Sequence, residues 1–84
     1  MPLTAYPLLD ERFALRQIGP GVRYLMNYMT GEYYELEEPQ LAALRLCDGT
    51  RTVARIAAGV GVSPGDADAF ITAQAEDGVV ALHD

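Results

Sequence analysis

The chain has 84 residues, half of them apolar, and this length allows one small domain with a single hydrophobic core. Twelve acidic residues against six basic ones give a net charge of −6, which repels phosphate backbones and anionic membrane surfaces. Nucleic acid and membranes are therefore excluded as expected partners, and a disordered chain is excluded because such chains lack this apolar content.

The first half of the chain shows the alternation of polar and apolar residues that is typical of β-strands. Three strands are predicted, over residues 13–18, 22–29 and 33–36. The connectors Gly19-Pro20-Gly21 and Thr30-Gly31 are short and contain glycine, as in turns between neighbouring antiparallel strands. We therefore expect an antiparallel meander whose third strand lies at an edge, preceded by a loosely ordered N-terminal segment over residues 1–11.

After residue 38 the pattern changes to helical periodicity, and three helices are predicted. The first begins at Pro39, a residue favoured at the first helical position, and stops at Asp48-Gly49. Thr52 can cap the second helix, which ends in the glycine-containing run 59–61. Ser63 caps the third helix, with a proline and an acidic residue following it in the first turn.

Each predicted helix has one apolar face. These faces are formed by Leu41, Leu44 and Cys47, by Val53, Ile56, Ala57 and Val60, and by Ala67, Phe70, Ile71 and either Gln74 or Ala75. A sheet of this size is not stable alone, so the strands and helices must share one core. Gly78 ends the third helix, and residues 79–82 either form a short terminal strand or pack beneath that helix. The sequence leaves both alternatives open.

Cys47 is the single cysteine and His83 the single histidine. One cysteine excludes an internal disulfide and fits a reducing compartment, and no signal-like or membrane-spanning stretch is present, so we expect a soluble cytoplasmic protein. Cys47 should be a small buried hydrophobe, and His83 an exposed residue near the terminus. Because no nucleophile, base and orienting group can be assembled from them, we expect no enzymatic activity, no cofactor and no metal site.

A series of short motifs runs in fixed order from residue 31 to residue 80. They are Gly31, Glu35-Leu36, the run Leu44-Arg45-Leu46-Cys47-Asp48-Gly49, the run Arg51-Thr52-Val53-Ala54-Arg55-Ile56, Ala69-Phe70-Ile71, and Gly78-Val79-Val80. In this order and spacing the stretch 31–80 resembles the PqqD-like family, the recognition elements (RREs) of enzymes that modify ribosomally synthesised peptides (RiPPs). The resemblance implies an α+β, winged-helix-like fold in which a three-stranded antiparallel sheet is followed by three helices, in one domain spanning 1–84.

The resemblance also implies a function. Such domains capture the leader region of a precursor peptide by adding it as a strand beside the third strand, with the third helix as the other wall, and present it to a modifying enzyme. That enzyme is often a radical SAM protein, or another RiPP maturase. The peptide-binding residues implied here are Glu32, Tyr33, Tyr34, Glu35 and Leu36 on the strand and Ala67, Phe70, Ile71 and Gln74 on the helix.

The physics of strand addition gives further expectations. Tyr33 and Tyr34 point to opposite faces of the strand, so one should fill the core and the other should present an exposed surface to the peptide. The acidic third helix should favour a leader that carries Lys or Arg. The enzyme would need a second surface, for which the arginines of the first two helices, Arg45, Arg51 and Arg55, are the hypothesis. A free edge strand allows a monomer or a homodimer.

An alternative interpretation comes from a different class of protein. The second and third helices also fit the loose spacing of a helix-turn-helix, which would make the chain an acidic winged-helix transcriptional regulator or an antitoxin-like protein. The helix that would enter DNA carries no Lys or Arg. Its charged residues are Asp66, Asp68, Glu76 and Asp77. Phosphate contacts need cations or donors, so the peptide-binding hypothesis is favoured.

Overall fold

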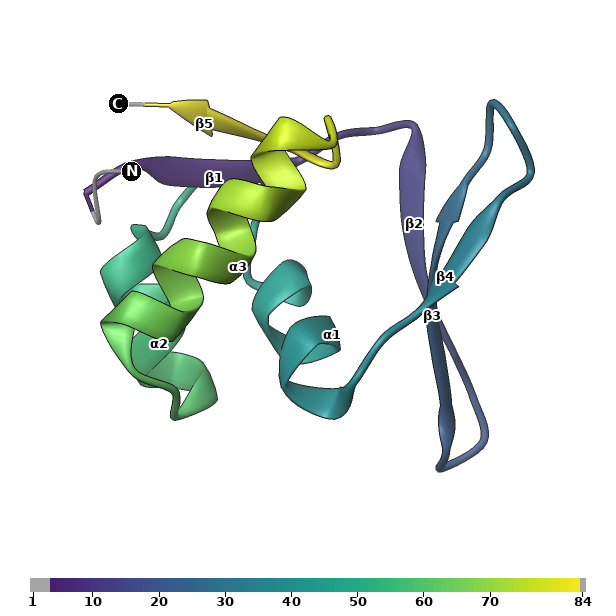
Figure 1. Cartoon of the computed structure of the whole chain (residues 1–84), viewed down its shortest axis with the longest axis horizontal. Helices are drawn as coiled ribbons and strands as arrows, with labels where there is room; N and C mark the ends of the chain where they lie inside the picture. Colours follow the sequence, from purple (N-terminus) through teal and green to yellow (C-terminus); the bar gives the residue numbers. More distant parts are fainter. Residues whose placement is uncertain (1–3, 84) are drawn as a thin grey trace.

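The computed structural model describes residues 4–83. In chain order the elements are β1 (Tyr6–Leu9), β2 (Phe13–Ile18), β3 (Val22–Asn27), β4 (Tyr33–Glu35), α1 (Glu38–Arg45), α2 (Val53–Val60), α3 (Pro64–Glu76) and β5 (Val80–His83). The α+β class, with a three-stranded antiparallel sheet followed by three helices, is confirmed. Figure 1 shows this sheet at one end of the molecule, with α1 between it and the pair formed by α2 and α3.

The three-stranded sheet has the order β2-β3-β4, so β4 is an edge strand, as predicted. Leu25 on β3 lies opposite Leu15 on one side and opposite Tyr34 on the other. Gly31 adopts a φ of 76° in the turn before β4, a left-handed conformation that glycine takes without a steric penalty. This turn sets the register that decides which β4 side chains face the helices.

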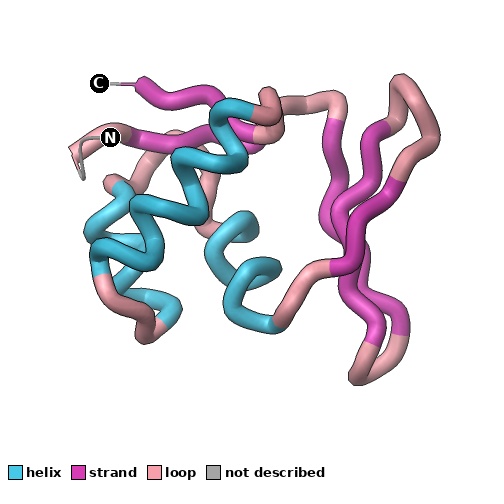
Figure 2. The backbone as a smooth tube through the Cα atoms, in the orientation of Figure 1, coloured by secondary structure: helices cyan, strands magenta, loops and turns pink. Residues whose placement is uncertain are grey.

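A second sheet was not predicted. β1 pairs antiparallel with β5, from Tyr6 opposite His83 to Leu9 opposite Val80, and Figure 2 shows the two strands side by side. The expectation of a loosely ordered segment over 1–11 is therefore wrong for residues 6–9, and residues 1–3 lie outside the described part of the chain. Main-chain bonds hold β1 in place, because Leu9 N–H donates to the Cys47 carbonyl at 2.8 Å. The open question about residues 79–82 is settled in favour of a strand.

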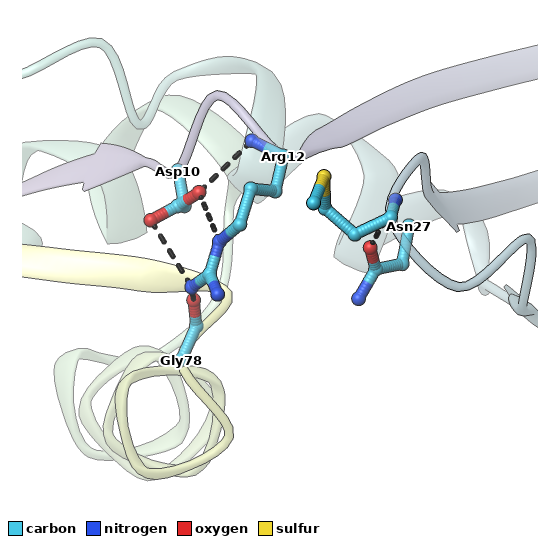
Figure 3. Close-up of polar contacts among 5 residues, drawn as sticks. Asp10, Arg12, Asn27 and Gly78 are labelled. Carbon is cyan, nitrogen blue, oxygen red and sulfur yellow. Dashed lines mark hydrogen bonds and ion pairs between the residues drawn. The ribbon is translucent and has the colours of Figure 1, made fainter.

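The connection from β1 to β2 is fastened to the end of α3 (Figure 3). Arg12 Nε donates to Asp10 Oδ1 at 2.9 Å, and Arg12 Nη2 contacts the Gly78 carbonyl at 3.5 Å. Asp10 N–H donates to the Val79 carbonyl at 2.8 Å. The hydrogen bonds from Arg12 lower the pKa of Asp10. An exposed ion pair of this kind contributes little stability, but the set of bonds fixes where β2 begins relative to α3.

The predicted caps are present. Thr52 Oγ1 accepts from Arg55 N–H at 3.2 Å, and Ser63 Oγ accepts from Asp66 N–H at 3.1 Å. These bonds satisfy main-chain donors that the first turn of a helix leaves unpaired. Gly61 ends α2 in the left-handed conformation, with a φ of 83°.

The core lies between the three helices, one face of the three-stranded sheet and β5. Its buried residues are Leu25, Ala43, Leu44, Cys47, Val53, Ile56, Ala57, Ala67, Ile71, Val79 and Val80. α1 ends at Arg45, earlier than predicted, yet Cys47 is still buried and its thiol donates to the Ala43 carbonyl at 3.3 Å. The expectation that Cys47 is a buried hydrophobe is confirmed.

Burial makes Cys47 unreactive in the folded chain. Burial first, and the neighbouring Asp48 charge second, raise its pKa from an ordinary 9.0 to about 12. Because the thiolate is the nucleophile, we expect the native protein to resist iodoacetamide at pH 8 and to react rapidly in denaturant. The raised pKa also makes folding stability depend on pH. Below pH 9 the Cys47 thiol is neutral in both the folded and the unfolded chain, and stability is unaffected. Between pH 9 and about 12 the thiol ionises only in the unfolded chain, so the free energy of unfolding falls as the pH rises. Rapid labelling of the native chain, followed by mass spectrometry, would contradict this burial.

Candidate functional site

A groove with a volume of about 470 Å³ lies between β4 and the C-terminal half of α3. It is lined by Phe13, Leu25, Asn27, Tyr34, Glu35, Leu36, Gln40, Phe70, Gln74, Asp77 and Val79. The lining mixes apolar and polar groups, which is the composition of a site that both buries a ligand side chain and orients it. β4 and α3 are the two elements to which the family resemblance assigns the peptide site, and peptide binding there stays a prediction.

Five of the predicted site residues line this groove together: Tyr34, Glu35, Leu36, Phe70 and Gln74. Ala67 and Ile71 do not, and this part of the prediction is wrong. Their side chains are 4% and 0% exposed and belong to the core. The two residues are one helical turn apart, so they share a face of α3, whereas Phe70 and Gln74 share the adjacent face. The helical period admits either face as the groove wall, and only the packing of α3 on α2 decides which one it is.

Both tyrosines of β4 are exposed, Tyr33 by 68% and Tyr34 by 52%. The expectation that one of them fills the core is therefore wrong. Tyr34 does point to the helix side of the sheet, opposite the buried Leu25, but the groove lies there in place of packed core. In most sheets of this kind at least one face of the edge strand is covered. On β4 both faces are accessible, and each presents one large aromatic side chain.

The main chain of β4 has one side free. Asn27 N–H donates to the Glu32 carbonyl at 2.8 Å, and Leu36 N–H donates to the Arg23 carbonyl at 2.9 Å. Main-chain groups alternate in direction along a strand, so Tyr33 and Glu35 direct their N–H and C=O groups away from β3. No other strand in residues 4–83 pairs with that side. β4 therefore presents two donors and two acceptors to an extended chain beside the groove.

A second, more apolar depression of about 440 Å³ lies on the opposite face of β4. It is lined by Val22, Tyr24, Met26, Gly31, Tyr33 and Glu35. The rings of Tyr24 and Tyr33 are tilted by 59°, with their centroids 5.5 Å apart. We call this depression the outer pocket, since the helices lie on the other face of the sheet.

Several groove residues were missed by the sequence analysis. They are Phe13, Leu25, Asn27, Gln40, Asp77 and Val79. Strand register gives a signal for Leu25, which is the direct partner of Tyr34. Gln40 carries no comparable signal, because its role at the start of α1, where its Oε1 accepts from Glu37 N–H at 2.9 Å, does not reveal that it also borders the groove.

The charge of the site is negative. The groove lining holds two carboxylates, Glu35 and Asp77, and no Lys or Arg. Two of the three arginines proposed for docking an enzyme have partners within the chain: Arg51 pairs with Asp48 at 2.7 Å, and Arg45 donates to Gln17 Oε1 at 3.4 Å. The groove is thus complementary to a cationic ligand, and docking through the arginines stays a hypothesis.

The groups that could support other chemistry lie apart from the groove. Cys47 is in the core, and His83 is exposed at the end of β5, as expected. Within residues 4–83, no three His, Cys, Asp or Glu side chains are grouped so as to hold a metal ion. In the same part of the chain, every helix is too short or too polar to cross a membrane.

The comparisons with known proteins give one informative result. No protein-family model matches the chain, and no curated protein matches it. A solved structure described as lasso peptide synthetase B1 complexed with the leader peptide is similar, with a TM-score of 0.67 and 27% sequence identity. The similarity covers 92% of this chain and 99% of the other, so it extends over nearly the full length of both chains.

Proposed function

We propose that this chain is a non-catalytic adaptor that binds the leader region of a ribosomally synthesised precursor peptide and presents it to a modifying enzyme. The observation that carries the proposal is the free edge of β4, where Tyr33 and Glu35 direct main-chain groups outward beside the groove. The likeness to a lasso peptide synthetase B1 complexed with its leader peptide supports the same ligand class.

The leader binds as an added strand. Its main chain pairs with Tyr33 and Glu35, which provides affinity for any extended sequence. The leader residue opposite Tyr34 then points to the helix side and enters the groove between Tyr34 and Phe70, with Gln74 one turn further along α3. Main-chain pairing provides the affinity, and the fit of this one side chain selects which leader sequence is bound.

The adaptor acts by raising the effective concentration of the precursor at the enzyme. Once the leader is bound, the encounter of the core peptide with the enzyme becomes intramolecular, and this requires no catalytic group on the adaptor. We place the chain among the PqqD-like recognition elements, acting in the cytoplasm. The similar structure belongs to a lasso peptide synthetase, so it supports leader recognition, and service to a radical SAM enzyme remains a prediction from the resemblance.

The alternative, a winged-helix regulator that binds DNA, is not favoured by any observation on α3. The helix carries Asp66, Asp68 and Glu76, and Asp77 follows at its C-terminal cap. These carboxylates repel phosphates, whereas they attract the basic residues of a peptide.

The proposal is tested by titrating the ¹⁵N-labelled chain with a synthetic leader peptide of the precursor encoded beside its gene. We expect amide shifts concentrated on β4 and on the groove side of α3. Replacing Tyr34 with serine should weaken binding about thirtyfold, the effect of losing an aromatic interface anchor. The matched control is Tyr6→Ser, because Tyr6 is an exposed tyrosine on β1 that lines neither pocket. A titration without shifts, or equal losses in both variants, would refute the proposal.

A further inference from the structure

The outer pocket lies where an added strand must place side chains. Residues directly opposite one another in a sheet project to the same face. Tyr33 and Glu35 both offer free main-chain groups and both line the outer pocket. A leader residue paired with either of them therefore points onto the outer face, next to the residue that enters the groove.

The chemistry of the outer pocket favours a long basic side chain. Val22 and Met26 provide apolar surface for an aliphatic stem, and the Tyr24 and Tyr33 rings provide aromatic faces for a cation. Glu35 provides a carboxylate at the edge. A guanidinium fits this combination best, because it is planar, stacks on aromatic rings and pairs with carboxylates through two parallel hydrogen bonds.

Arg16, the arginine directly opposite Tyr24, has a partner outside the outer pocket. Arg16 lies opposite Tyr24 on β2, on the side away from β4, and its Nη2 donates to the Tyr28 hydroxyl at 3.3 Å. It does not line the outer pocket. The Glu35 carboxylate has no ion-pair partner among the described residues, so its charge is available to a ligand.

We infer that leader recognition uses both faces of β4, with an arginine or lysine of the leader, adjacent to the groove residue, bound in the outer pocket by Tyr24, Tyr33 and Glu35. The inference rests on the proposed function, because it requires a leader strand along β4. The outer pocket would add specificity that the groove alone does not provide. Side chains alternate between the two faces of a strand, so a site on one face contacts only every second leader residue.

The test is a double-mutant cycle measured by calorimetry. The ligand is the synthetic leader of the precursor encoded beside the gene, and variants of it carry methionine in place of each Arg or Lys in turn. One such peptide variant should bind the wild-type chain about tenfold more weakly, the effect of a cation–π contact together with an ion pair. The same peptide variant should lose little further affinity for the Glu35→Gln or Tyr33→Ser chain, because the contact is already absent. Glu11→Gln is the control, since it makes the same charge change at an exposed turn residue outside both pockets.

The outcomes separate this inference from the proposed function. If the wild-type chain binds the leader with shifts on β4 and α3 but no basic leader residue couples to Glu35 or Tyr33, the outer pocket is not used and the adaptor role stands. Amide broadening on Tyr24 and Met26 that grows with protein concentration, without peptide, would show that a second copy covers this face and would overturn the inference. A leader that gives no shifts at all would refute both.

Discussion

A chain with Ile71 replaced by aspartate is expected to be unfolded at room temperature. Ile71 is 0% exposed and lies in the core cluster, so the substitution removes a large apolar side chain and buries an unpaired carboxylate. The lost packing costs about 2 to 5 kcal/mol and the buried carboxylate several kcal/mol more, which together are comparable to the total stability of about 4 to 13 kcal/mol for a chain of this length. Circular dichroism should show loss of helix and no cooperative thermal transition.

The control for this experiment is Ala73→Asp, which places the same charge two residues further along α3 at an exposed position. We expect its melting temperature to stay within a few degrees of the wild-type value, since a surface change usually alters stability by about 0.5 kcal/mol or less. If Ile71→Asp instead melted normally and lost only leader binding, Ile71 would face the peptide as the family resemblance implies, and the position of α3 described above would be wrong.

A chain with Glu35 replaced by proline is expected to stay folded and to lose leader affinity by about tenfold to a hundredfold. Glu35 N–H points away from β3, so proline removes no hydrogen bond within the sheet and is tolerated there, as it is on edge strands. It does remove one donor to the leader, whose carbonyl is then left unpaired against β4. Calorimetry with the synthetic leader measures the loss, and thermal melting verifies the fold.

The side chain of Glu35 must be separated from its main chain. Glu35→Ala removes the carboxylate but keeps the N–H, so the proline variant should bind more weakly than the alanine variant by the contribution of the hydrogen bond. Equal affinities of the two variants would mean that the leader does not pair with this edge. Tyr34→Pro is expected to behave differently, because the main chain of Tyr34 pairs with Leu25 on β3. Proline at this position removes a hydrogen bond within the sheet, so the melting temperature should fall.

The local features of this fold follow from the sequence alone. Glycine turns and alternating residues set the meander, and Thr52 and Ser63 cap helices through bonds to residues three positions away. The edge position of β4 also follows, because the helical segment comes directly after it and no further strand of the meander is present. Each of these features depends on residues that are only a few positions apart. They can therefore be predicted from capping residues and from the spacing of apolar residues.

What the tertiary structure decided depends on contacts between distant residues. β1 exists because β5 pairs with it, from Tyr6 to His83, and four residues that include a proline carry no recognisable alternation of their own. The choice between Ala67 with Ile71 and Phe70 with Gln74 as the groove wall depends on how α3 rotates onto α2, since the helical period allows both. The two accessible faces of β4 are also decided by tertiary packing. Tyr34 is open because a groove separates it from α3, and Tyr33 is open because it lies on the outer face, which the helices do not cover.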